Sequence, residues 1–328
     1  MNVSADSQVI LLLCSHLGLP PNAQPEPMTL RDWNPLAGKI HASPLKRPGA
    51  LLEMSADDLR AGLDLTESEV ERIAVLLERA GLLAIELERL QSLGIWALTR
   101  ADDEYPAKLR HRLKHAAPPV LFGAGRRKLS DQPGLAIVGS REVNETGQGA
   151  AQFLGAACAD NGWVVLSGGA RGVDGLAMNA ALERRGQVVG LLADSLERTV
   201  RNVDLRASLE GGTLTLITPY SPKAPFSVGA AMGRNRLIYA LADYAMVVAC
   251  EAEKGGTWSG AVEALKHDWV PVFVCDGAGF PEGNRSLQKK GASAFPIPFP
   301  DAADAIPAWL AAGHDCPKPT QGNLFGEG

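Results

Sequence analysis

Residues 163–184 read WVVLSGGARGVDGLAMNAALER, and this stretch joins three kinds of local structure in order. Trp163 to Leu166 is a short apolar run of the kind that forms a buried strand. The glycine-rich segment after it suits a tight turn, and residues 173–184 have the composition of a helix. A strand that leads through a glycine turn into a helix is the first half of a βαβ unit.

The same alternation continues on both sides of this stretch, from about residue 130 onward. Strands are expected at 135–138, 163–166, 187–192, 213–217, 245–249 and 270–274. Nearly all of their residues are apolar, as in parallel strands that are buried on both faces. Helices are expected between them at 147–160, 173–184, 235–242 and 259–267. We therefore predict an α/β fold with a Rossmann-like, doubly wound and mostly parallel sheet.

A small helical N-terminal domain with a proline-rich connector is expected before the sheet, at residues 1–100. Ser55 can cap a short helix. Thr66 and Glu69 have the spacing of a capping box, and Gly81 is expected to end the helix that this box begins. The sheet domain is expected at 101–300 and a flexible C-terminal tail at 301–328.

Composition excludes several classes of protein. With 46% hydrophobic and 21% charged residues, the 328-residue chain is globular rather than disordered. A formal net charge of -5 gives no overall attraction to nucleic acid, so such binding requires a local basic surface. No apolar run approaches the roughly 18 residues of a membrane span, and the five scattered cysteines form no C-x-x-C pair. We expect a cytoplasmic protein without membrane contact, metal site or cofactor.

Three loops expected at the carboxyl ends of the strands are rich in glycine, and two of them carry arginine. Glycine lets backbone N–H groups approach a phosphate, while arginine supplies charge and a bidentate fork. One such turn can be simple turn geometry, but three at one sheet edge favour anion binding. The segment 234–236 is expected to open a helix over the same edge. The candidate phosphate-binding residues are Gly139, Ser140, Arg141, Ser167, Gly168, Gly169, Arg171, Gly172, Arg234, Asn235, Arg236, Gly255, Gly256 and Thr257.

Other ligands have less support in these loops. No G-x-G-x-x-G joins the first strand to the first helix and no P-loop motif occurs, so NAD and ATP are not expected. Trp258 and Tyr220 are the aromatic residues expected near this edge, which makes base stacking a smaller contribution than phosphate contact.

Several motifs in the stretch from about residue 94 to 292 resemble the bacterial DNA-processing protein A family, DprA or Smf. They are LTRADDEYPAKLR at 98–110, PPVLFGAG at 118–125, LAIVGSR at 135–141, LSGGARGVDGLAMNAAL at 166–182 and GRNRLIYALAD at 233–243. The resemblance implies an extended Rossmann fold and a homodimer, and we expect no catalysis. It also implies sequence-independent binding of single-stranded DNA, in DNA uptake (natural transformation), recombination or repair, with transfer of the strand to the RecA recombinase. The DNA-contacting positions that it implies are Ser140, Arg141, Ser167, Gly168, Gly169, Arg171, Arg234, Asn235 and Arg236.

The sequence departs from the family pattern at several points. Met232 and Gly233 stand where the family has Phe-Pro. We also expect the chain to lack the C-terminal winged-helix domain that many relatives carry. These changes suggest a divergent subgroup.

Two further readings remain open. Gly255, Gly256 and Thr257, with Glu263 on the next helix, are similar to the loop and glutamate of nucleoside-monophosphate phosphoribohydrolases of the LOG family, so an enzyme or a nucleotide sensor is the alternative. In the tail, Gln321, Leu324 and Phe325 fit the short Q-x-x-L-F pattern of peptides that bind the DNA polymerase sliding clamp.

Overall fold

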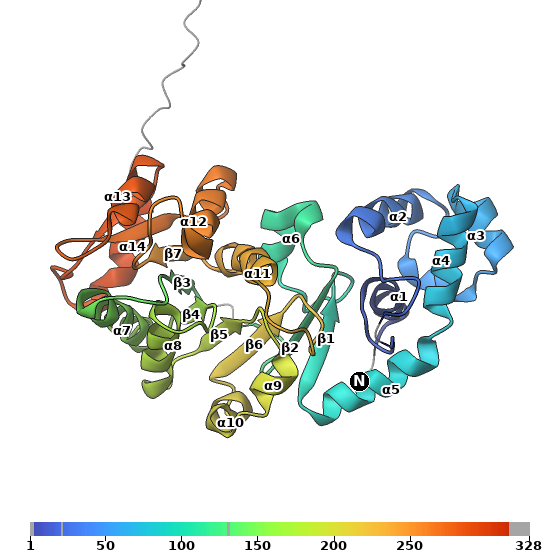
Figure 1. Ribbon diagram of the computed structural model, residues 1–328, viewed down its shortest axis with the longest axis horizontal. Helices are drawn as coiled ribbons and strands as arrows, with labels where there is room; N and C mark the ends of the chain where they lie inside the picture. Colours follow the sequence, from blue (N-terminus) through green and yellow to red (C-terminus); the bar gives the residue numbers. More distant parts are fainter. Residues whose placement is uncertain (1–2, 21, 130–131, 315–328) are drawn as a thin grey trace, which may run out of the picture. The chain divides into compact units, whose positions relative to one another are not determined.

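The computed structural model describes residues 3–20, 22–129 and 132–314, and it forms two compact units (Figure 1). Unit 1 comprises residues 1–131 and 190–234, and unit 2 comprises residues 132–189 and 235–328. The strand order of the sheet is β1-β2-β6-β5-β4-β3-β7-β8-β9. The domains predicted from the sequence are consecutive segments divided at residues 100 and 300, whereas each unit combines two separate stretches of the chain. The predicted domain boundaries stay a prediction.

Unit 1 begins with helices and continues with antiparallel strands. Strand β1 pairs with β2, and β2 pairs with β6, both antiparallel. The elements of unit 1 are α1 (Ala5–Cys14), α2 (Leu30–Ala42), η1 (Pro48–Glu53), α3 (Ala56–Leu63), α4 (Glu67–Leu77), α5 (Ala80–Ser92), β1 (Ile95–Thr99), α6 (Ala107–Leu113), η2 (Lys114–Ala116), β2 (Val120–Ala124), α9 (Leu196–Val200), α10 (Val203–Glu210) and β6 (Leu214–Thr218).

The predicted caps of the N-terminal helices are confirmed. Ser55 caps α3, and Thr66 and Glu69 form the capping box of α4, in which the Thr66 N–H donates to Glu69 Oε2 at 2.8 Å. The prediction that Gly81 ends α4 is wrong, because α4 ends at Leu77 and Gly81 lies in the first turn of α5. Glu78 keeps right-handed helical angles at the junction, so the turn needs no glycine with positive φ.

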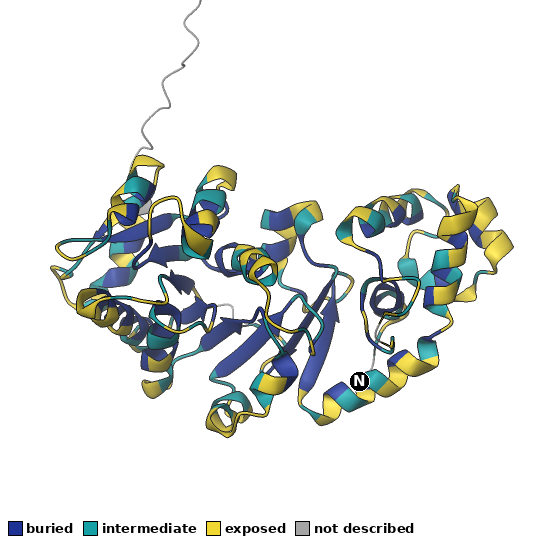
Figure 2. Cartoon of the chain, in the orientation of Figure 1, coloured by how far each residue is buried: buried dark blue, intermediate teal, exposed yellow. Residues whose placement is uncertain are grey.

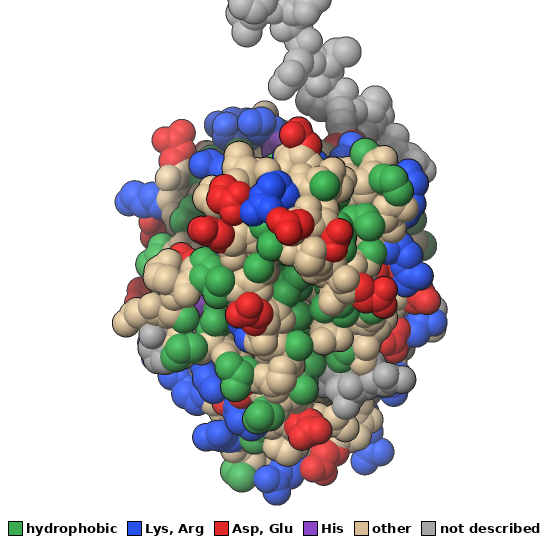
Figure 3. Space-filling view, turned by 90° about the vertical axis from the view of Figure 1, so that its right-hand side faces the viewer, with side chains coloured by type: hydrophobic (Ala, Val, Ile, Leu, Met, Phe, Trp, Pro, Cys, Tyr) green, Lys and Arg blue, Asp and Glu red, His purple; other side chains and the backbone are tan. Residues whose placement is uncertain are grey.

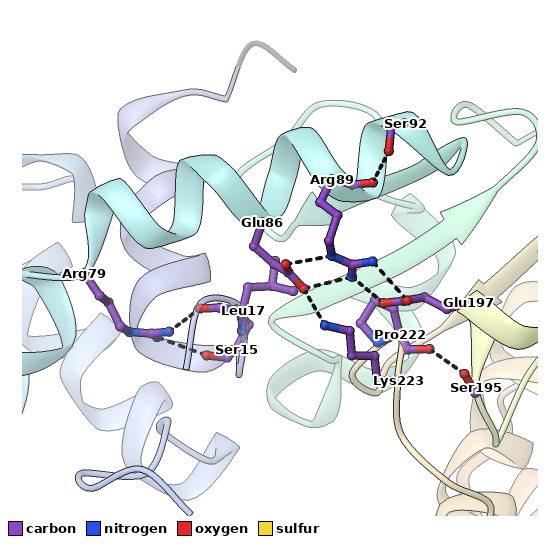
Figure 4. A network of polar contacts seen from close by, with 10 residues as sticks. All are labelled: Ser15, Leu17, Arg79, Glu86, Arg89, Ser92, Ser195, Glu197, Pro222 and Lys223. Carbon is purple, nitrogen blue, oxygen red and sulfur yellow. Dashed lines mark hydrogen bonds and ion pairs between the residues drawn. The ribbon is translucent and has the colours of Figure 1, made fainter. Parts of the chain in front are cut away.

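Buried arginine holds the helices of unit 1 together (Figure 4). The Arg79 guanidinium donates to the carbonyls of Leu12, Ser15 and Leu17, which lie in and just after the last turn of α1. These contacts satisfy carbonyls that lack partners within the helix, and burial lowers the pKa of Arg79 to about 10. Further along α5, Arg89 pairs with Glu86 at 2.8 Å and with Glu197 of α9 at 2.5 Å. One network therefore ties α5 to both α1 and α9.

The face of the N-terminal helices carries positive and negative side chains mixed together, with apolar side chains between them (Figure 3). No extended surface of one charge is visible on this face, which argues against it as a polyanion-binding surface.

Unit 2 is a parallel α/β layer. Strand β3 pairs in parallel with both β4 and β7, and β7, β8 and β9 pair in parallel in turn. In Figure 1, α7 and α8 lie on one side of these strands and α12 and α13 on the other. Its elements are β3 (Gly134–Val138), α7 (Glu145–Asp160), β4 (Val164–Ser167), α8 (Val173–Glu183), β7 (Tyr244–Val247), α12 (Gly255–His267), β8 (Val272–Asp276), α13 (Glu282–Lys289), β9 (Ser293–Pro296), η3 (Ala303–Ala305) and α14 (Ile306–His314), while β5 (Val188–Leu191) and α11 (Val228–Leu241) each cross the boundary between the units.

The predicted α/β class with a mostly parallel, Rossmann-like sheet behind N-terminal helices is confirmed. All six predicted strands are present, with ends displaced by no more than two residues. Strands β3 and β4 are buried along their whole length, as their apolar composition requires (Figure 2). Strands β1, β2 and β9 are additional. No helix in the described ranges is long and apolar enough to cross a membrane.

Candidate nucleic-acid interface

The order in which strands are added to the sheet changes direction at strand β3. The chain passes from β3 to β4 on one side and later returns to β7 on the other side of β3. In open parallel sheets, ligands bind beyond the carboxyl ends of the strands at such a switch point. The loops after β3, β4 and β7 are therefore the candidate site.

The loop after β3 is the centre of this edge, because it contacts both of its neighbours. The Ser140 N–H donates to the carbonyl of Ala249, just after β7, at 2.9 Å, and the Ser140 hydroxyl donates to the same oxygen at 3.2 Å. A Cβ on Gly139 would come within 2.5 Å of Val173 Cγ2 at the start of α8. Arg141, the next residue along, is exposed.

Hydrogen bonds to β3, to the start of α8 and to the loop after β3 fix the loop between β4 and α8. Ser167 is buried and its hydroxyl donates to the carbonyl of Ile137 on β3 at 2.6 Å. The Gly168 N–H donates to the buried carboxylate of Asp174 at 3.0 Å. Gly172 caps α8 with a φ of 84°, and the Val173 N–H donates to the Ser140 carbonyl at 3.3 Å.

These bonds divide the candidate residues of this loop into two groups. Ser167, Gly168 and Gly172 shape the loop, while Gly169 and Arg171 are exposed and can meet a ligand. Within the described residues, Arg171 makes no ion pair.

The third loop supplies an uncapped helix N-terminus. Gly255 and Gly256 form the first turn of α12, and the N-cap residue Lys254 provides no side-chain hydrogen bond to the N–H groups there. The Thr257 hydroxyl donates to the Gly139 carbonyl at 3.1 Å, which joins this helix start to the loop after β3. The first N–H groups of a helix have no partner within it, so this end suits an anion.

The segment Arg234, Asn235, Arg236 does not open a helix, and that prediction is wrong. Helix α11 begins at Val228, so the segment lies in its middle and its side chains point in different directions. Arg234 is buried and donates to the Leu191 carbonyl at the end of β5. Asn235 donates to the Gly256 carbonyl at 3.0 Å, and exposed Arg236 pairs with Glu263 of α12.

Asn235, Gly139 and Ser140 are thus brought into one bonded cluster with Gly256, Thr257 and the start of α8. The side chains of Arg141, Arg171 and Arg236 form its exposed cationic part. We call this surface, with Gly169 and the first turn of α12, the carboxyl-edge site. Acids accompany the cations, since exposed Glu142 and Glu253 lie in the same loops and Glu251 lies 3.8 Å from Lys254.

The aromatic residues expected at this edge contribute little surface. Trp258 is buried at 8% exposure, with Lys290 5.8 Å from its ring centre. Tyr220 is half-buried and donates its hydroxyl to the Ala230 carbonyl at 2.9 Å. Phe226, which the sequence patterns do not single out, is 49% exposed in the segment before α11.

The cysteines that the structure describes in unit 2 are core residues. Cys158, Cys250 and Cys275 are buried, and burial raises the pKa of Cys158 and Cys250 to about 12. A thiol that stays protonated is neither a nucleophile nor a metal ligand at neutral pH. Among the described residues, no group of histidine, cysteine or acidic side chains could hold a metal ion.

The family model described as DNA recombination-mediator protein A matches residues 96–301. The chain belongs to this family. The matched range contains every strand of the sheet except the first residue of β1, together with all the candidate loops. The resemblance to DprA and Smf proteins is confirmed.

Curated relatives agree with this assignment. The DNA processing protein DprA of Bacillus subtilis is 26% identical over 250 residues, which cover 75% of this chain and 80% of the relative. Protein Smf of Escherichia coli is 31% identical over 241 residues, or 67% of this chain and 63% of the relative. The putative DNA processing protein DprA of Mycobacterium tuberculosis is 31% identical over 192 residues, and this chain spans about half (49%) of that relative's length.

Solved structures show the same fold. DprA from Streptococcus pneumoniae superposes with a TM-score of 0.58 at 21% identity, covering 85% of this chain and 98% of that one. DNA processing protein A from Helicobacter pylori, whose single-stranded DNA binding mode is described as unique, gives a TM-score of 0.51 at 24% identity. That comparison covers 66% of this chain and 96% of the other.

Proposed function

We propose that this protein binds single-stranded DNA without sequence preference and that the carboxyl-edge site makes the contacts. The observation that supports the proposal is the joining of three glycine-rich loops at the switch point. They leave Arg141, Arg171 and Arg236 exposed beside the uncapped start of α12. Family membership and the DNA ligand of the Helicobacter pylori relative point the same way.

The chemistry of this site fits a phosphate backbone better than nucleobases. Guanidinium groups and backbone N–H donors bind phosphate oxygens, which carry no sequence information. Trp258 is buried, so base stacking at this edge has little aromatic surface to use. Binding should therefore tolerate any sequence and weaken steeply with salt.

We infer a role without catalysis, in DNA uptake, recombination or repair, as a homodimer in the cytoplasm that can pass its strand to RecA recombinase. The clamp-binding residues Gln321, Leu324 and Phe325 lie outside the described residues. Binding to the sliding clamp stays a prediction from the sequence.

The experiment measures fluorescence anisotropy of a labelled oligo-dT strand and of a matched duplex at several salt concentrations. Arg171→Gln should weaken binding of the single strand roughly five- to twentyfold, because it removes one charge-assisted contact. The slope of log K against log salt should become shallower by about 0.7.

Arg184→Gln is the matched control. It removes the same charge from unit 2 as Arg171→Gln does. Arg184 follows the end of α8, at the opposite edge of the sheet from the carboxyl-edge site, and pairs there with Asp160 at 2.6 Å. Equal affinities of both variants would contradict the proposed site. Failure of the wild type to bind at low salt would contradict the proposed function.

The LOG-type reading has less support from the geometry. Glu263 lies about two turns beyond the Gly255 and Gly256 loop, and its carboxylate is engaged by Arg236 rather than directed at a ribose. Release of free base from a nucleoside monophosphate by the purified protein would favour this alternative over DNA binding.

A further inference from the structure

The ion pair between Arg236 and Glu263 places an acid inside the proposed DNA site. Arg236 Nε lies 2.9 Å from Glu263 Oε1 and donates to Oε2 at 3.0 Å. The arginine side chain is 49% exposed and the glutamate side chain 28%. In the described part of the chain, Arg236 makes no other hydrogen bond or ion pair, so its terminal nitrogens contact no protein acceptor.

The packing of α11 against α12 does not depend on this pair. Asn235 bonds to the first turn of α12 at 3.0 Å. Two turns of the two helices approach so closely that a Cβ on Gly260 would lie 2.9 Å from the Tyr239 ring. An ion pair as exposed as this one contributes little to stability, so α11 and α12 should stay packed together without the Glu263 carboxylate.

The pair does change what the site offers to a polyanion. A guanidinium and the carboxylate paired with it carry no net charge together, so the pair attracts phosphates and releases counterions less than a free arginine does. An incoming phosphate must also compete with the carboxylate for the same cation. Glu263, on the adjacent helix α12, supplies the exposed Arg236 of the carboxyl-edge site with a counter-charge.

We propose that Glu263 acts as an electrostatic brake on DNA binding: by pairing with Arg236 it lowers the affinity of the carboxyl-edge site for single-stranded DNA and speeds release of the strand. This inference rests on the proposed function. It assigns Glu263 a role in setting affinity rather than in contacting or cleaving a substrate.

Glu263→Gln tests the brake, because the amide keeps the size of the side chain and an oxygen for Arg236 Nε while it removes the charge. We expect the variant to bind oligo-dT roughly three- to tenfold tighter. The salt slope should steepen by about 0.7, as one more cation takes part. Stopped-flow displacement should place most of the gain in a slower dissociation rate.

Asp160→Asn is the control for net charge. Like Glu263→Gln, it removes the acid of an arginine–carboxylate pair in unit 2, here the pair of Asp160 with Arg184 at 2.6 Å. Asp160 lies at the end of α7, at the opposite edge of the sheet from the carboxyl-edge site. We expect the affinity of this variant for oligo-dT to stay within about twofold of the wild type, because salt largely screens a charge at the opposite edge of the sheet from the bound strand.

The outcomes separate the two proposals. A wild-type protein that binds the strand, with Glu263→Gln unchanged or weaker, would overturn the brake and leave the proposed function intact. If Glu263→Gln and Asp160→Asn bound the strand equally more tightly, the change in net charge alone would explain the gain, and the brake would also be overturned. Absence of binding by the wild type at low salt would remove the proposed function itself.

Discussion

Replacement of Gly172 by alanine should destabilise the protein at the point where the loops of the carboxyl-edge site meet. Gly172 has φ 84° and ψ -135°, a region that residues with a side chain rarely occupy. A Cβ there would overlap the carbonyl oxygens of Ser140 and Arg141. The backbone strain costs about 1 to 3 kcal/mol, and displacement of the loop backbone adds about 1 to 3 kcal/mol. We expect a total loss near 3 kcal/mol.

Gly149→Ala is the matched control, because the same chemical change should act in the opposite direction. Gly149 lies within α7, and a Cβ built on it meets no atom within 4 Å. Alanine in the middle of a helix is more stable than glycine by about 0.5 to 1 kcal/mol.

Equilibrium urea unfolding, followed by circular dichroism, measures both variants against the wild type. A loss near 3 kcal/mol lowers the urea midpoint by roughly 1 M if the slope is about 3 kcal/mol/M. Affinity for oligo-dT should also fall in Gly172→Ala at temperatures where it is folded, since the Ser140 loop must move. A Gly172→Ala protein as stable as Gly149→Ala would refute both the positive φ and the close approach of the two loops.

Two further predictions concern buried groups of unit 2. Asn284→Ala should lower the free energy of unfolding in urea by about 2 to 4 kcal/mol. The Asn284 side-chain amide accepts from the Cys250 N–H and donates to two carbonyls near the ends of β7 and β8, and all three bonds would be lost. A loss below about 1 kcal/mol would contradict that role. Burial raises the pKa of Cys158 from about 9 to about 12, so the unfolded chain releases this proton first and stability falls as pH rises from 9 to 12. Cys158→Ala should make this fall shallower by as much as about 1.4 kcal/mol per pH unit, and unfolding curves of equal pH dependence for the two proteins would contradict the raised pKa.

The parallel strands of unit 2 are the part of the fold that the sequence specifies most directly. Runs such as 135–138 are continuously apolar because both faces of the strand are buried, and this signal needs no tertiary information. Of the three additional strands, β9 lacks it, whereas β1 and β2 are buried throughout and carry short apolar runs at 95–98 and 120–122 that the sequence prediction did not assign to strands. Gly123 interrupts β2 because the Trp96 ring occupies the space of a side chain there, and β9 ends at Pro296. These strands depend on contacts with distant segments, which local pattern cannot reveal.

For the loops of the candidate site, too, the sequence predicts one part and tertiary contacts decide the rest. Their position at one sheet edge follows from the alternation of strands and helices, and the structure joins Ser140 to Val173 and Thr257 to Gly139 as that alternation requires. The role of each polar group does not follow. Gly168 is bonded to Asp174, and Ser167 is bonded within the sheet, because a buried loop must first satisfy its own N–H and hydroxyl groups.

The Arg-Asn-Arg segment shows why residue type alone misassigns such groups. Once α11 extends back to Val228, residues 234 and 236 are separated by about 200° around the helix axis, so both cannot face one ligand. Arg234 is accordingly buried against the Leu191 carbonyl, whereas Arg236 is exposed and meets Glu263. Helix length therefore decides which arginine can bind phosphate, and the acid opposite it decides how strongly.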